Sequence, residues 1–144
     1  MKIPIEFLVD GIQTGKVYYF SSTKIRTEIP HYFICTKKTT QDLLILVCCT
    51  SDRNDKNKKY AELRGLHKTL VWINPTEENG FTKDTFVNCN TIVKYSVEEF
   101  KNMYEQNILE YKGEIEENHL EQVIIGLLAS LQIEEEIKQL FREN

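Results

Sequence analysis

The first two thirds of the chain alternate between short runs of β-branched and aromatic residues and polar connections. Runs of roughly four to eight such residues, bounded by turn residues, are typical of β-strands. The run over residues 43–49 is apolar throughout, which indicates a strand covered on both faces. We therefore predict strands at residues 15–20, 31–35, 43–49, 69–73 and 85–89, with a hairpin connection at 36–42.

The period changes in the last third of the chain, where apolar residues recur every three or four positions. Ser96 and Glu99 have the spacing of a capping box, in which each side chain bonds a backbone N–H at the start of a helix. This motif predicts a helix from Ser96 to about Asn107. Two further helices are predicted at residues 116–131 and 134–142, where apolar positions share one face.

Five or six antiparallel strands followed by helices predict an α+β fold. Many short strands with non-local pairing favour a small antiparallel β-barrel, with helices laid on it or closing one end. A chain of 144 residues without an internal repeat fits a single domain. We assign the barrel to about residues 15–95 and the helical part to about residues 96–143.

Composition narrows the class of protein. Apolar residues make up 41% of the chain and charged residues 28%, which is typical of a globular domain. The longest apolar runs fall short of the roughly 18–20 residues that cross a bilayer. Charge interrupts the first residues before a signal-peptide core can form. We expect a soluble cytoplasmic protein without a membrane partner.

The four cysteines do not have the pattern of a disulfide framework or a zinc site. None has Cys-x-x-Cys spacing, and three lie inside apolar runs. The adjacent Cys48 and Cys49 would point to opposite faces of a strand. We predict buried reduced thiols, no metal site and no cofactor.

Charge is distributed unevenly along the chain. Residues 1–94 carry fourteen Lys and Arg against ten Asp and Glu, a net charge of +4. Residues 95–144 carry four against twelve, a net charge of −8. This asymmetry favours an anionic ligand at the first part, although an ordinary solvated acidic helical face explains it as well. The polar stretch 51–64 predicts a long loop.

Three segments, in this order, resemble the PemK/MazF family of toxin endoribonucleases. Residues 15–20 are similar to the family's opening glycine-led strand. Residues 30–35 and 43–51 are similar to its paired strands, where a proline begins the first and a Thr-Ser pair closes the second. Residues 86–92, followed by a helix, are similar to the strand that leads to its terminal elements.

The resemblance implies an SH3-like barrel with a C-terminal helix, and metal-independent cleavage of single-stranded RNA by the ribose 2′-hydroxyl. It also implies a homodimer and an antitoxin partner protein. The family usually has an arginine directly before the strand-opening proline. Here Ile29 holds that position and Arg26 is the nearest arginine, while Asn88 or Asn90 stands where the late strand often carries an acidic residue.

Such cleavage needs a base, an acid and donors that hold the phosphate. Histidine suits the proton transfers because its ordinary pKa lies near neutral pH, and arginine suits the phosphate because it offers paired donors. The predicted catalytic residues are His31, Arg26, Thr50 and Ser51. The predicted RNA-binding residues are Lys24, Lys56, Lys58, Lys59, Asn88 and Asn90.

Each of these residues also has a structural interpretation. His31 can be a half-exposed residue that opens a strand, Thr50 and Ser51 can start a turn, and the charges can belong to solvated loops. Asn88 and Asn90 can support a turn, and Tyr18, Tyr19, Tyr32 and Trp72 can fill a barrel core as well as stack on bases. The alternative functions are a catalytically silent binding module with the same fold, or a relative of the gyrase-poisoning toxins that share this barrel.

Overall fold

The computed structural model describes residues 14–25, 29–50 and 69–142. Each of the five strands predicted from the sequence is present, but the strand predicted at residues 85–89 continues to Ser96, and the other ends shift by at most three residues. The three predicted helices are present as well. The elements are β1 (Lys16–Phe20), β2 (His31–Lys38), β3 (Leu43–Thr50), β4 (Leu70–Ile73), β5 (Thr85–Ser96), α3 (Val97–Glu105), β6 (Glu110–Glu114), α4 (Glu117–Ala129) and α5 (Glu135–Arg142).

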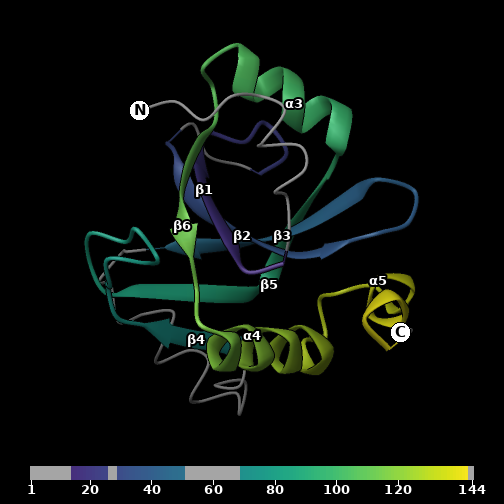
Figure 1. Cartoon of the computed structure of the whole chain (residues 1–144). Helices are drawn as coiled ribbons and strands as arrows, with labels where there is room; N and C mark the ends of the chain where they lie inside the picture. Colours follow the sequence, from purple (N-terminus) through teal and green to yellow (C-terminus); the bar gives the residue numbers. More distant parts are fainter. Residues whose placement is uncertain (1–13, 26–28, 51–68, 143–144) are drawn as a thin grey trace.

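The strands form one antiparallel sheet in the order β4-β5-β3-β2-β1-β6. The sheet is curled, and helices cover both of its faces, α3 on one and α4 with α5 on the other (Figure 1). The predicted α+β fold, with short antiparallel strands in a curled sheet, is therefore confirmed. Among the helices in the described part of the chain, none combines the length and apolar character needed to cross a bilayer.

Two hydrophobic cores lie on opposite faces of the sheet. Strand β3 contributes alternate residues to both, with Val47 facing α4 and α5, and Leu46 facing the core beneath α3. Both residues are fully buried, as the continuous apolar run predicted. We call the face that carries α3 the α3 face and the opposite one the α4 face.

The capping box at the start of α3 is confirmed. The Glu99 backbone N–H donates to Ser96 Oγ at 3.0 Å, and the Ser96 backbone N–H donates to Glu99 Oε1 at 2.9 Å. These two bonds satisfy donors that the first turn of a helix otherwise leaves open. The helix then packs Phe100 and Tyr104 against the sheet, where both are buried.

The structure differs from the prediction in strand β6, which lies in the part expected to be helical and pairs with β1. Its charged residues hide the strand pattern, as is common for an edge strand. The Glu114 backbone N–H also donates to the Glu78 carbonyl oxygen at 2.7 Å. A Cβ at Gly113 would lie 2.1 Å from that same oxygen, so only glycine permits this approach.

The four cysteines are free and buried, as the sequence predicted. Burial raises the pKa of Cys48 to about 11 and the pKa of Cys35 and Cys89 to about 12. Burial also raises the pKa of Cys49 well above its ordinary value. These thiols are therefore protonated and unreactive near neutral pH.

Candidate functional site

Two of the predicted catalytic residues lie side by side at one end of the α3 face. Strands β2 and β3 pair Tyr32 with Cys49, and the next positions along the two strands are His31 and Thr50. Both side chains belong to the α3 face by strand alternation, and His31 packs edge-on against Phe33 of the core there. The sheet thus brings together an imidazole and a hydroxyl that the sequence separates by nineteen positions.

One ring nitrogen of His31 is already used. Nδ1 lies 3.0 Å from the Ile29 carbonyl oxygen, and a carbonyl can only accept a hydrogen bond. Nδ1 must therefore carry the hydrogen, which makes Nε2 the basic nitrogen of the neutral ring. A histidine held in this way can accept a proton at a fixed position.

An aromatic pair extends this row of residues towards the sheet edge. Thr50 pairs with Phe86 of β5, and Phe86 pairs with Trp72 of β4. The two rings meet edge to face with centroids 4.1 Å apart. Phe86 is buried, whereas the Trp72 side chain is 43% exposed, so the row presents an aromatic surface to solvent. We call the row His31, Thr50, Phe86 and Trp72 the open end of the α3 face.

The sequence alone does not mark Phe86, and it marks Trp72 only as one of several aromatic residues. The alternation in residues 69–73 and 85–89 puts both residues on one face of a hairpin, which is a usable signal. The pairing of that hairpin with residue 50 could not be read from the sequence, because Thr50 and Phe86 are 36 positions apart.

The two predicted asparagines lie in a bulge of β5 and make internal hydrogen bonds. Val47 pairs with Ile92, but the next residue of β3 pairs with Asn88, so β5 bulges between these positions. Asn88 Oδ1 accepts from the Asn90 backbone N–H at 3.1 Å, and Asn90 Nδ2 donates to Thr69 Oγ1 at 3.0 Å. These hydrogen bonds agree with the structural interpretation of the two asparagines, because both side-chain amides bind neighbouring groups of the protein.

The bulge is also tied to the end of α4. Ser130 Oγ donates to Asn90 Oδ1 at 2.6 Å and accepts from the Gln132 backbone N–H at 3.1 Å. Ser130 is fully buried, so this bond joins the α4 face to the bulge. Asn90 therefore holds elements together, and its amide is engaged on both its nitrogen and its oxygen.

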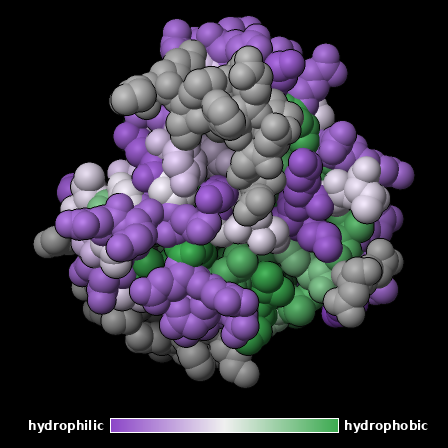
Figure 2. Space-filling model, in the orientation of Figure 1, coloured by the Kyte–Doolittle hydropathy of each residue, from purple (hydrophilic) through white to green (hydrophobic). Residues whose placement is uncertain are grey.

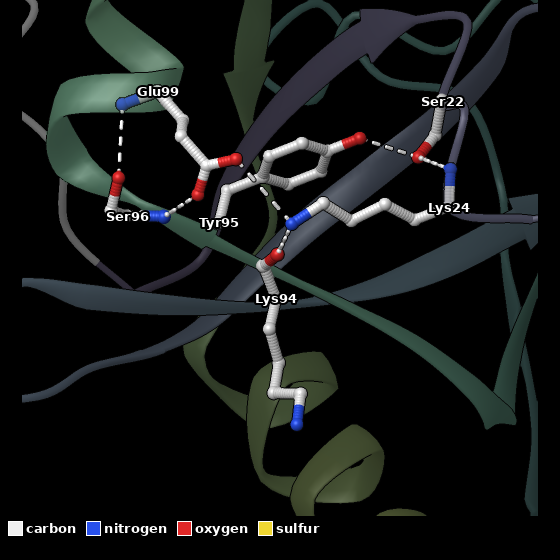
Figure 3. Close-up of polar contacts among 6 residues, drawn as sticks. All are labelled: Ser22, Lys24, Lys94, Tyr95, Ser96 and Glu99. Atoms are coloured by element: carbon white, nitrogen blue, oxygen red, sulfur yellow. Dashed lines mark hydrogen bonds and ion pairs between the residues drawn. The ribbon is translucent and has the colours of Figure 1, made fainter.

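Lys24 lies beside α3, in a polar cluster of six residues (Figure 3). Its ammonium donates to the Lys94 carbonyl oxygen, lies 3.5 Å from Glu99 Oε2 and sits 4.2 Å from the centroid of the Tyr95 ring. Ser22 Oγ lies 2.5 Å from the Tyr95 hydroxyl and accepts from the Lys24 backbone N–H at 3.2 Å. The fold thus engages Lys24 in internal contacts.

The remaining predicted site residues lie outside the described residues. These are Arg26 and Ser51 of the catalytic set, and Lys56, Lys58 and Lys59 of the RNA-binding set. Chain connectivity alone relates two of them to the open end, because Ser51 follows Thr50 directly and Arg26 precedes His31 by five positions. Their roles stay predictions from the sequence.

Comparison with known proteins does not identify a family. No protein-family model matches the chain, and no curated protein is significantly similar to it in sequence. The likeness to the PemK/MazF family therefore rests on the motifs described above. Within the described ranges, no group of three or more His, Cys, Asp or Glu side chains is placed to hold a metal ion.

Proposed function

We propose that this protein is an endoribonuclease of the PemK/MazF type, which cleaves single-stranded RNA without a metal ion. The observation that supports this function best is the row at the open end, where an oriented histidine lies beside a hydroxyl and an exposed tryptophan lies at the far end of the same row. Imidazole, hydroxyl and indole are the groups that handle a proton, a phosphate and a base respectively.

In the proposed reaction, His31 Nε2 takes the proton of the ribose 2′-hydroxyl. The 2′-oxygen then attacks the adjacent phosphorus, and the bond from phosphorus to the 5′-oxygen breaks. The products are a 2′,3′-cyclic phosphate and a 5′-hydroxyl, whose oxygen takes a proton from water. Thr50, with Ser51 and Arg26 as predicted from the sequence, donates hydrogen bonds to the phosphate oxygens.

The remaining parts of the proposed function follow from the resemblance to the PemK/MazF family. They include an SH3-like barrel, for which the curled antiparallel sheet is compatible support, together with a homodimer and an antitoxin protein that blocks the RNA groove. Lys56, Lys58 and Lys59 follow Thr50 closely in the chain and are proposed to contact the RNA backbone. Lys24 and Asn90 make internal contacts, so the proposal does not depend on them.

The test is incubation of the purified protein with a long, weakly structured RNA in EDTA, followed by mapping of the cut ends. We expect cuts at a short recurrent sequence, each leaving a cyclic phosphate. His31→Ala should slow cleavage about 10²-fold or more, the usual loss for a general acid or base. Arg26→Ala should slow it as well.

His119→Ala is the matched control, because His119 is a partly exposed histidine on α4, away from the open end. It should cleave at the wild-type rate. An unchanged rate and unchanged cut sites in His31→Ala would remove His31 from the mechanism. Activity that appears equally in every variant would indicate a contaminating nuclease.

A second candidate function is a binding module without catalysis on the same surface. Ile29 in place of the family's arginine favours it, and the exposed Trp72 can stack on bases whether or not a reaction follows. Intact RNA that still binds the protein, with binding lost in Trp72→Ala, would support this second function over the first.

A further inference from the structure

Helix α4 carries more apolar surface than the core uses. Val123 and Leu127 are fully buried against the sheet, as expected for the inward face of an amphipathic helix. On the neighbouring stripe, Ile124 and Leu128 are only half-buried, and Ile125 is 58% exposed. Leu131, just beyond the helix, is 86% exposed.

Helix α5 continues this apolar surface. It packs against α4, and its Leu140 and Phe141 lean on the core while staying half-exposed. Figure 2 shows apolar side chains gathered over α4 and towards α5, bordered by hydrophilic ones. We call this region the α4/α5 surface; it consists of Ile124, Ile125, Leu128, Leu131, Leu140 and Phe141.

The same two helices are strongly acidic. Between residues 116 and 142 there are six glutamates against one lysine and one arginine, a net charge of −4. Arg142 is engaged in an ion pair with Glu135. Glu117 and Glu121 lie on the side of α4 that carries Ile124 and Leu128, and both are exposed.

We propose that the α4/α5 surface binds a basic amphipathic helix of a partner protein. Ile124 and Leu128 are four positions apart on α4 and therefore share one side of the helix, and Leu131 adds an exposed apolar side chain directly beyond the helix end. A partner helix with leucine-like residues on one face and Lys or Arg beside them covers the apolar stripe and pairs with the glutamates that border it.

The negative charge of α4 and α5 favours a basic partner helix over a second copy of the chain. A symmetric dimer through the same surface would set Glu117 and Glu121 of one copy against those of the other, and like charges oppose such contact. A basic helix gains from the same charges. The proposal is independent of RNA cleavage, because the open end lies on the opposite face of the sheet.

The probe is a fluorescein-labelled synthetic helix of Leu and Lys in heptad order, with binding to the full chain followed by anisotropy. A peptide of the same pattern with Glu in place of Lys is the charge control. We expect the Lys peptide to bind, the Glu peptide to bind at least about tenfold more weakly, and binding of the Lys peptide to weaken with salt. Equal binding of both peptides would overturn the choice of a basic partner.

Two variants test the location. The double variant Ile125→Gln with Leu131→Gln changes exposed side chains, so the fold should survive, and the affinity for the Lys peptide should fall at least about tenfold. Ile108→Gln is the matched control, because Ile108 is 46% exposed outside α4 and α5. Circular dichroism of each variant verifies folding. Unchanged affinity in the folded double variant would overturn the site.

Sedimentation of the chain without peptide tests whether a second copy of the chain covers the α4/α5 surface. We expect the oligomeric state to be the same in wild type and in the double variant Ile125→Gln with Leu131→Gln. A dimer that dissociates in this variant would show that a second copy covers the surface, and it would overturn the proposed basic partner.

Discussion

Two regions of the α3 face, the polar cluster beside α3 and the open end, use their polar side chains in opposite ways. Beside α3, the charged and hydroxyl groups of Lys24, Glu99 and Ser22 bind one another or the backbone. At the open end, the His31 ring is held at Nδ1 and keeps a basic Nε2, and Trp72 is 43% exposed. A lysine near an apolar strand can thus serve the fold, whereas the partly exposed Trp72 presents an aromatic surface to solvent.

The largest effect should come from removing the packing beneath α3. Phe100 is fully buried and touches the rings of Tyr18, Phe20 and Tyr95, with centroids 4.8 to 6.3 Å away. Phe100→Ala should lower the free energy of unfolding by about 3–5 kcal/mol, because it leaves a cavity among aromatic rings. Urea unfolding measures the change.

The matched substitution at the open end is Trp72→Ala. Trp72 is larger than Phe100 but partly exposed, so its loss should cost clearly less stability. Equal losses for the two variants would contradict this difference between the buried ring of Phe100 and the partly exposed ring of Trp72.

The next effect concerns binding at the open end. Trp72→Ala should weaken binding of a single-stranded RNA oligonucleotide by about 1–3 kcal/mol, which is roughly 5- to 150-fold, because one stacked base loses its platform. Trp72 is the only tryptophan in the chain, so quenching of its emission reports stacking directly in the wild type.

Ile108→Ala serves as the control for this measurement, because it removes a comparably exposed apolar side chain away from the open end. It should leave RNA affinity unchanged. If Trp72→Ala binds RNA as tightly as wild type, and titration leaves the emission of the wild type unchanged, the open end is not an RNA surface.

How far the sequence predicted the fold depended on the range of the interactions. The capping box needs only residues three positions apart, and it was predicted correctly. Strand β6 was missed because Glu110 and Lys112 do not mark a strand, and its pairing with β1 joins residues more than ninety positions apart. Local sequence patterns thus predicted most of the strands and helices, whereas the edge strand β6 depends on pairing between distant parts of the chain.

The same distinction holds for the site. His31 and Thr50 were each chosen from local motifs, but only the register of β2 and β3 makes them neighbours. The internal roles of Lys24 and Asn90 depend on partners 75 and 40 positions away, Glu99 and Ser130. No local pattern carries such contacts, so a charge or amide that looks free in the sequence can be engaged in the fold.

The smallest expected effect concerns the Glu99 carboxylate in the polar cluster beside α3. The Ser96 backbone N–H that donates to the Glu99 carboxylate lowers its pKa, and the nearby Lys24 ammonium lowers it further. A carboxyl whose folded pKa is depressed stabilises the fold above its unfolded pKa, near 4.5, and this stabilisation is lost as pH falls through the folded pKa.

Glu99→Gln should therefore lower the free energy of unfolding at pH 7 by at most about 1 kcal/mol, since the carboxylate is half-exposed and screened by water. The difference from wild type should shrink as pH falls below about 4.5, where protonation removes the same charge from the wild type. Urea unfolding at several pH values measures it. Glu105→Gln, at the exposed end of the same helix, is the control and should lower the free energy of unfolding at pH 7 by less. A difference for Glu99→Gln that stays constant down to low pH would mean that the Glu99 charge, and with it the contact to Lys24, contributes nothing to the free energy of unfolding.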